Sequence, residues 1–198
     1  MGNCFKEVST KDVSRMIPYI VILIYTTFIW DFFICPIPSE ASTQSLVNSN
    51  KSRLLNHFYI AIFTINLLFY LAPLSIALFQ LMENHSPNIP MWMVVAGSII
   101  AICGRIFSIV GGAILSKRRE KLVSISIFRW SRNPITLGMH LTFLGLIICT
   151  NHLFLLIGLA FSVWNMHLKI NIEEKHLIKK FGLRYTNYKF KTPKYLWM

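Results

Sequence analysis

The residues best placed to do chemistry lie in two short polar segments on either side of an apolar run near the C-terminus. Arg129, Arg132 and Asn133-Pro134 precede the run, and Glu173-Glu174 follow it. Proline suits the first turn of a helix, where its missing N–H costs nothing, so we expect Asn133 to be the N-cap. Arg132 would then lie beside exposed helix N–H groups, a favourable place for a carboxylate or a phosphate. The simpler interpretation is positive charge that marks the cytoplasmic side.

The acidic segment carries a second charged pair. Lys169 precedes Glu173 by four residues, so both side chains lie on one face of the expected helix. A carboxylate at the membrane edge can hold a cationic cofactor. The alternative is an ordinary surface ion pair.

Arg105 is a third candidate, because an ionisable residue inside an apolar run is costly and usually functional. Its alternatives are snorkelling to the membrane surface and internal pairing with Asp31.

The composition indicates what must position these residues. The chain has 198 residues, of which 54% are hydrophobic and 14% charged, with a mean hydropathy of +0.52. These values are typical of an integral membrane protein. The sequence therefore predicts an all-α membrane protein with about five transmembrane helices and a cytosolic helical tail. Residues 1–198 form one membrane domain, with N-terminal spans in 1–103 and a catalytic half in 104–198.

Three long spans are expected at about 17–35, 58–82 and 91–115, with a kink at Pro73. The apolar run 139–168 is interrupted at Asn151-His152, and we expect a tight hairpin of two helices of roughly 12–16 residues there. The net charge is +12. Because its lysines and arginines gather in the 117–137 loop and the tail, both should be cytoplasmic and the N-terminus outside.

Other classes of site find little support. Basic residues are not interleaved with aromatics in a soluble face, which argues against nucleic-acid binding. The histidines and cysteines lack metal-ligand spacing, so no metal site is expected. Gly111-Gly112 is expected to allow close helix packing. An interfacial aromatic belt is expected at the end of the chain, formed by Tyr185, Tyr188, Tyr195 and Trp197.

Taken together, the C-terminal half resembles the isoprenylcysteine carboxyl methyltransferase and phospholipid methyltransferase superfamily. The resemblance covers roughly residues 104–195. It rests on Phe128-Arg129, on the element 132–138 that stands for the family's Arg-His-Pro-x-Tyr-x-Gly, and on residues 173–188. The last segment matches every fixed position of Glu-Glu-x-x-Leu-x-x-x-Phe-Gly-x-x-Tyr-x-x-Tyr.

The resemblance implies a methyltransferase that uses S-adenosyl-L-methionine in a cytosol-facing pocket. The residues it assigns to the cofactor are Leu122, Val123, Phe128, Asn133, Pro134, Ile135, Thr136, Leu137, Glu173 and Glu174. Arg132, Lys169 and Arg105 are the catalytic candidates, with Lys169 near the acceptor carboxylate. The chain departs from the family at three cofactor contacts, where Phe128, Asn133 and Thr136 replace Tyr, His and Tyr, and Ser126 replaces a glycine.

The function expected from the resemblance is methyl transfer to a membrane-associated acceptor. A prenylcysteine carboxylate is favoured because it needs no general base, ahead of a phospholipid amine or a thiol. Two alternatives remain. One is an NADPH-dependent sterol-type reductase, in which Lys117-Arg118-Arg119 would bind the extra phosphate of NADPH. The other is a non-catalytic relative. The protein would reside in the endoplasmic reticulum of a eukaryote or the plasma membrane of a bacterium. The sequence indicates no oligomeric state.

Overall fold

The described part of the chain is helical throughout. The computed structural model describes residues 10–34, 53–83, 89–117 and 122–196; within the first two helices it describes the side chains of residues 15–29 and 64–82. These residues contain no strand. The helices are α1 (Thr10–Ile34), α3 (Arg53–Met82), α4 (Met91–Lys117), the 3-10 helix η1 (Ser126–Arg129), α5 (Pro134–Thr150), α6 (Leu155–Phe181) and α7 (Leu183–Lys191).

The apolar helices confirm an all-α membrane protein. Three helical segments are long and apolar enough to cross a bilayer: Thr64–Met82, Met91–Lys117 and Leu155–Phe181. The apolar segments Arg15–Ile29 and Pro134–Thr150 are shorter. Large apolar side chains stay exposed along the helices, for example Leu23, Leu68, Trp92, Ile106 and Ile157. Exposure of this kind places the hydrophobic side chains against lipid rather than water.

The predicted hairpin is confirmed in position, but its two helices are longer than expected. Asn151 adopts the left-handed conformation at φ 53° and ends α5, which is a role that asparagine tolerates. However, α5 has 17 residues and α6 has 27, instead of 12–16 each. The helix α6 continues past its apolar part because the ion pairs of Lys169, Glu173 and Glu174 satisfy charged side chains on its later turns.

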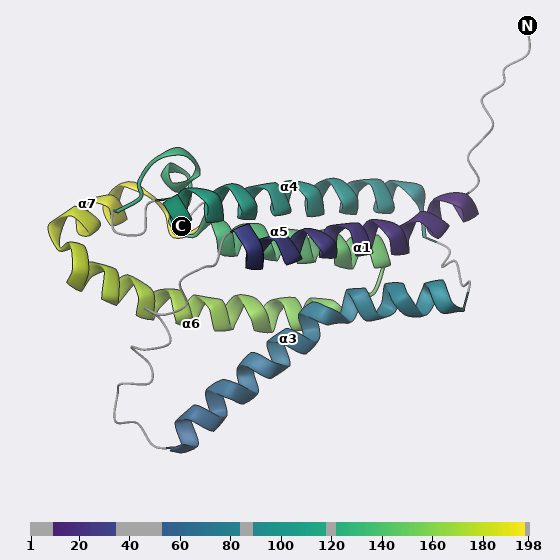
Figure 1. The fold of residues 1–198 in the computed structure, drawn as a ribbon, viewed down its shortest axis with the longest axis horizontal. Helices are drawn as coiled ribbons and strands as arrows, with labels where there is room; N and C mark the ends of the chain where they lie inside the picture. Colours follow the sequence, from purple (N-terminus) through teal and green to yellow (C-terminus); the bar gives the residue numbers. More distant parts are fainter. Residues whose placement is uncertain (1–9, 35–52, 84–88, 118–121, 197–198) are drawn as a thin grey trace, which may run out of the picture.

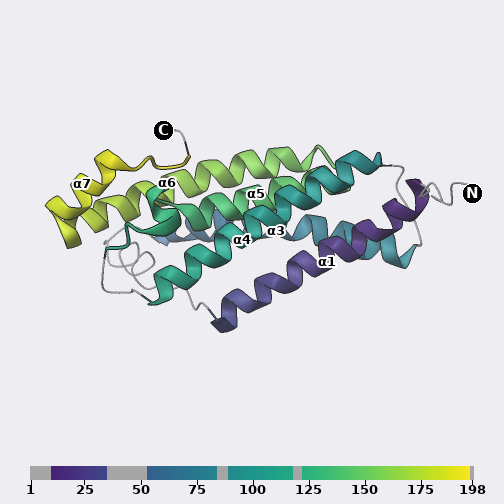
Figure 2. The ribbon, with the colours of Figure 1, turned by 90° about the horizontal axis from the view of Figure 1, so that it is seen from above.

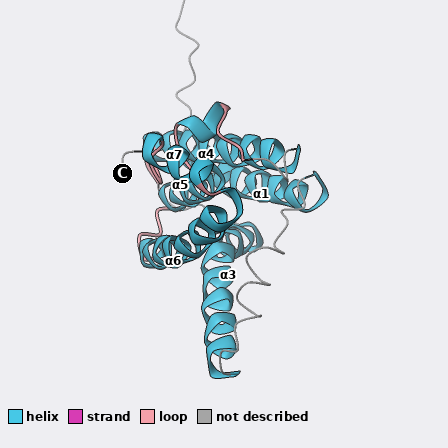
Figure 3. Ribbon diagram, turned by 90° about the vertical axis from the view of Figure 1, so that its left-hand side faces the viewer, coloured by secondary structure: helices cyan, strands magenta, loops and turns pink. Residues whose placement is uncertain are grey.

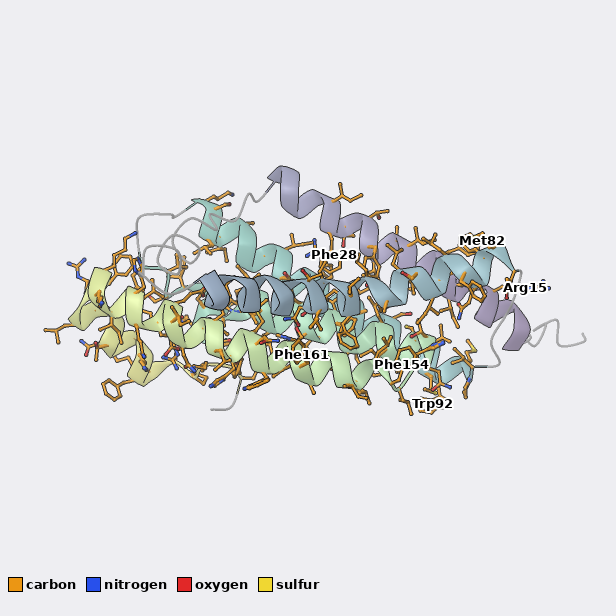
Figure 4. The ribbon with its side chains drawn as sticks, turned by 90° about the horizontal axis from the view of Figure 1, so that it is seen from below. Arg15, Phe28, Met82, Trp92, Phe154 and Phe161 are labelled. Carbon is orange, nitrogen blue, oxygen red and sulfur yellow. The ribbon has the colours of Figure 1, made fainter. Side chains whose placement is uncertain are left out.

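The helices run lengthwise in alternating directions, so α1 begins at the end of the molecule opposite α7 (Figures 1 and 2). Arg15, Met82, Trp92 and Phe154 gather at that opposite end (Figure 4). The polar segments 129–134 and 173–174 lie at the α7 end (Figure 1). The site is therefore an end of the bundle, built by η1, the start of α5, the last turns of α6 and α7.

A glycine seam joins α4 to α5. Gly97 and Gly104 face Gly145 and Gly138 across the antiparallel pair, and the two glycines of each helix are seven positions apart in the sequence. A Cβ built on Gly104 would lie 2.5 Å from the Thr142 nitrogen. The two backbones therefore touch along the seam, which small residues allow in membranes.

Gly111 extends the seam, since its Cβ would meet Ile135 at 2.8 Å. This confirms the expected close packing there. Because Ile135 is in the first turn of α5, the seam fixes that turn against α4.

The contact between α3 and α6 is different. Phe69 packs on Gly158, and Tyr70 contacts Ser162 one turn further along α6. The helix α3 is bent and its first half diverges from α6 (Figures 1 and 3). Pro73 explains a bend, because it cannot donate to the Phe69 carbonyl and clashes with it. We call the diverging region between α3 and α6 the fork.

Candidate functional site

The start of α5 is organised by the C-terminal tail. Pro134 occupies the first turn of α5, as expected. Asn133 stands at the N-cap position, but its side chain does not cap the helix. Its amide Nδ2 instead donates to the Lys194 carbonyl at 3.1 Å. The capping role was therefore wrong, because a carbonyl from a distant segment competes for the same side chain.

Further hydrogen bonds hold the tail across this turn. The Arg132 backbone N–H donates to the Pro193 carbonyl at 3.0 Å. The Ser131 hydroxyl donates to the Lys194 carbonyl at 3.2 Å and accepts from the Asn133 N–H at 3.1 Å. Ser131 is fully buried. The tail thus covers the 131–134 segment. The local sequence of neither segment predicts this pairing.

A charge cluster lies beneath this cover. Arg132 Nη1 is 3.2 Å from Glu174 Oε1, and Lys189 Nζ is 3.2 Å from Glu174 Oε2. The side chains of Arg132 and Glu174 are only 8% and 7% exposed. Two cations therefore share one buried carboxylate, which leaves the cluster with a net positive charge. The sequence pointed to Arg132 and Glu174 separately; Lys189 was missed, because it is one of many tail lysines.

The hydrogen-bonding capacity of the cluster is incomplete. Arg132 Nε and Nη1 are buried, and within the described residues neither makes a hydrogen bond despite the ion-pair distance. Buried donors of a guanidinium without acceptors are costly. The buried Nε–H of Arg132 can therefore donate to one oxygen of an added anionic group.

Two tyrosines of α7 close the cluster on one side. Tyr185 and Tyr188 are 2% and 9% exposed, and the Tyr188 hydroxyl donates to the Phe128 carbonyl at 2.7 Å. Burial raises the pKa of Tyr185 to about 12; the Glu174 carboxylate adds to the rise and Arg132 opposes it. The aromatic-belt interpretation was wrong for this pair, because both rings pack inward. Tyr195 is half-buried, and Trp197 lies outside the described residues.

The segment before α5 supplies backbone at the same end. Val123 and Phe128 are buried, and Leu122 is half-buried. Ser126 begins η1 at φ 54°, in the region that favours glycine. The resemblance places a glycine at this position, which would suit this conformation, whereas the serine carries the strain.

Lys169 and Glu173 form a separate pair. Lys169 Nζ is 3.9 Å from Glu173 Oε1, with side chains 49% and 41% exposed. Successive helical residues point about 100° apart, so Glu173 and Glu174 face different partners. The expected shared face of Lys169 and Glu173 is confirmed. Glu173 remains open to solvent beside the buried cluster.

The remaining candidates divide clearly. Ile135, Thr136 and Leu137 are half-buried in the first turn of α5. Arg105 lies elsewhere: its Nε and Nη2 donate to the Thr27 hydroxyl and carbonyl, each at 2.6 Å, and its guanidinium stacks over Phe28 at 4.2 Å. Phe28 of α1 is labelled in Figure 4. The Asp31 side chain lies outside the described residues. The structure thus does not bring Arg105 to Arg132.

Comparison with known proteins gives a family match over part of the chain. A family model described as phospholipid methyltransferase matches residues 89–184. No curated protein and no solved structure matches the chain. The match runs from the start of α4 to the start of α7, so it includes the seam, Arg132 and Glu174. Over this part, the chain matches the superfamily of isoprenylcysteine carboxyl and phospholipid methyltransferases, and the match supports a membrane methyltransferase of that type.

Proposed function

From this family match, we propose that the protein transfers a methyl group from S-adenosyl-L-methionine to the carboxylate of a prenylcysteine-type lipid. The observation that carries the proposal is the buried, net-positive cluster of Arg132, Glu174 and Lys189 beneath the C-terminal tail. Members of the family use S-adenosylmethionine. The cofactor supplies an electrophilic methyl group on a sulfonium sulfur.

The donors in the cluster fit the amino-acid end of this cofactor. Among the described residues, the buried Arg132 Nε–H has no hydrogen-bond acceptor, so it can donate to one oxygen of the cofactor's carboxylate. Glu173 lies beside the cluster with an exposed carboxylate, which suits an ammonium group or a ribose hydroxyl. Leu122, Val123, Phe128 and the first turn of α5 would line the remainder. The altered Asn133 and Thr136 change side-chain contacts, while the backbone at Ser126 has a positive φ that a glycine would also adopt.

Lys169 is the group proposed to orient the acceptor. Its side chain is half-exposed on α6 and already lies 3.9 Å from the Glu173 carboxylate. Lysine keeps the charge of the family's arginine and loses its bidentate fork. A carboxylate acceptor is nucleophilic without losing a proton, so Lys169 needs only to position it in line with the sulfonium. We propose that this end of the bundle and the C-terminus face the cytoplasm, since basic residues gather there.

The competing functions are separated by ligand binding. A sterol-type reductase would bind NADPH, and the family match argues against it. A non-catalytic relative would bind neither ligand, and the observation that favours this alternative is the replacement of two family side chains by Asn133 and Thr136.

The test is calorimetric titration of S-adenosylhomocysteine into detergent-purified wild type, Glu173→Ala and Glu83→Ala. We expect Glu173→Ala to abolish saturable binding while the protein stays folded, because it removes the exposed carboxylate beside Arg132. Glu83 is exposed at the opposite end of the molecule and serves as the matched control. Equal affinity of Glu173→Ala and wild type would remove Glu173 from the proposed site.

A further inference from the structure

The fork holds polar side chains whose hydrogen bonds are not made. Asn66 Oδ1 on α3 and Asn165 Nδ2 on α6 are buried, and neither has a hydrogen-bond partner among the described residues. Both belong to helix segments apolar enough to cross a membrane. Inside a bilayer no water replaces the missing partner, so each orphan group carries a large desolvation cost. A ligand that supplies the partners would explain why both remain.

The register of the two helices places the groups together. Tyr70 of α3 receives a hydrogen bond from Ser162 of α6 at 2.9 Å. The two helices run in opposite directions (Figure 1), and Asn66 and Asn165 each lie about one turn from that contact, on the side toward α7. Figure 3, seen from the α7 end, shows α3 leaving α6. The two amides therefore lie where the fork begins to open.

The deep end of the fork is closed by a hydrogen-bonded group. His140 of α5 contacts the Thr136 carbonyl through Nδ1 at 2.8 Å and Ser162 Oγ through Nε2 at 3.3 Å. Ser162 in turn reaches Tyr70. Below this group Phe69 fills the space over Gly158. The polar region thus has a floor on the side away from α7.

The same face of α6 leads from the orphan amides to the proposed methyl-transfer site. Ser162, Asn165, Lys169 and Glu173 are spaced by three, four and four residues, which aligns them on one side of the helix. Lys169 lies one turn from Asn165 in the direction of Glu173. A ligand whose carboxylate reaches Lys169 would therefore place the atoms next to that carboxylate beside Asn165.

We infer that Asn66 and Asn165 form a binding site for a secondary amide in the acceptor lipid, adjacent to the carboxylate that is methylated. The inference rests on the proposed function for the position of the carboxylate. Asn165 Nδ2 donates to the amide carbonyl, and Asn66 Oδ1 accepts from the amide N–H. A diester lipid offers only acceptors at this depth and would leave Asn66 unsatisfied. The amide thus selects a lipid attached to a peptide or acyl-amino chain.

The test compares two probes that differ in this group alone. N-acetyl-S-farnesylcysteine carries a secondary amide beside its carboxylate, and 3-(farnesylthio)propionic acid lacks the acetamido group. Binding to wild type, to Asn66→Leu/Asn165→Leu and to Gln80→Met would be measured by calorimetry in one detergent. Gln80 Oε1 is another buried oxygen on α3 without a partner, far from the fork, and makes Gln80→Met the matched control.

We expect wild type and Gln80→Met to bind the amide probe about 10-fold or more tightly than the propionic acid, as two hydrogen bonds predict. In the double variant the ratio should fall to about 1, with S-adenosylhomocysteine affinity unchanged. A wild-type ratio near 1, failure of wild type to bind the amide probe, or an unchanged ratio in the double variant would overturn the inference. If S-adenosylhomocysteine failed to bind while the probe ratio held, the proposed function alone would fail.

Discussion

The seam between α4 and α5 and the fork between α3 and α6 are both helix contacts made over glycine, yet they are built differently. In the seam, glycines on both helices bring backbone against backbone. In the fork, one glycine receives the side chain of Phe69, and polar atoms beyond it stay unpaired. Close backbone contact leaves no freedom to adjust, whereas a side-chain contact can shift.

This difference assigns the two contacts to different parts of the proposed site. The seam fixes the first turn of α5, which carries Asn133 and Thr136 on the proposed cofactor side. The fork borders Asn66, Asn165 and Lys169 on the proposed acceptor side. A chemically constant cofactor suits the fixed side. A long lipid chain suits the side that can open.

The largest effect should come from adding one methyl group to each contact. Gly145→Ala puts a Cβ 2.5 Å from the Gly97 carbonyl oxygen, and we expect it to destabilise the protein by about 2 kcal/mol. Gly158→Ala meets a side chain rather than backbone, with the Phe69 ring closest and Phe69 Cβ at 2.9 Å. The helix α3 must shift slightly at Phe69, so we expect a smaller loss of stability, which the gain in helix propensity partly offsets. Thermal unfolding in detergent measures both. Equal losses would mean that the fork is as tightly packed as the seam.

Removing polar atoms from the fork should have the opposite sign. Asn66→Leu/Asn165→Leu replaces two unsatisfied amides by apolar groups of similar shape, so the protein without ligand should gain about 1 kcal/mol of stability. The same unfolding experiment reports it. A loss of stability would show that the two amides are satisfied in the free protein, and the contrast with the seam would then weaken.

A smaller gain is expected where the chain enters the seam. Ser126 has φ 54°, and Ser126→Gly removes the cost of a side chain in that region, offset by the larger chain entropy of glycine. The net gain should be about 0.5 kcal/mol by denaturant or thermal unfolding. Ser124→Gly, in the same exposed segment without a positive φ, is the control and should not stabilise.

The smallest effect at neutral pH concerns α7, which covers the end of the seam. The folded-state pKa of Tyr185 is raised from 10 to about 12. The neutral phenol therefore contributes its full share to the free energy of unfolding below pH 10, and this share is lost as the pH rises toward 12. Between pH 8 and pH 11, wild type should lose more stability than Tyr185→Phe, which has no phenol to ionise. Parallel losses would contradict the burial of this phenol.

Much of the fold was readable because apolar length and charge are local signals. The apolar runs predicted α1, α3 and α4, and Asn151 marked the hairpin turn. The length of α6 was not predicted, since it depends on ion pairs with Arg132 and Lys189, which lie far away in the sequence. For the same reason the Lys194 carbonyl, which takes the Asn133 side chain from its capping role, had no sequence signal.

The site shows the same division. Motif spacing found Arg132, Glu173 and Glu174, because the family pattern is written in consecutive residues. It gave Tyr185 and Tyr188 the wrong surroundings, since aromatic residues near a membrane edge suit an interface as well as a buried contact. The orphan amides Asn66 and Asn165 could not be recognised, because an unmade hydrogen bond is visible only when the neighbours are known.

The central claim is that the end of the bundle beneath the tail binds S-adenosylmethionine. The most direct measurement is calorimetric titration of S-adenosylhomocysteine and, separately, of NADPH into the detergent-purified protein. The account predicts saturable binding of S-adenosylhomocysteine with a stoichiometry of about one per chain and no binding of NADPH. Binding of NADPH alone, or of neither ligand, would contradict it.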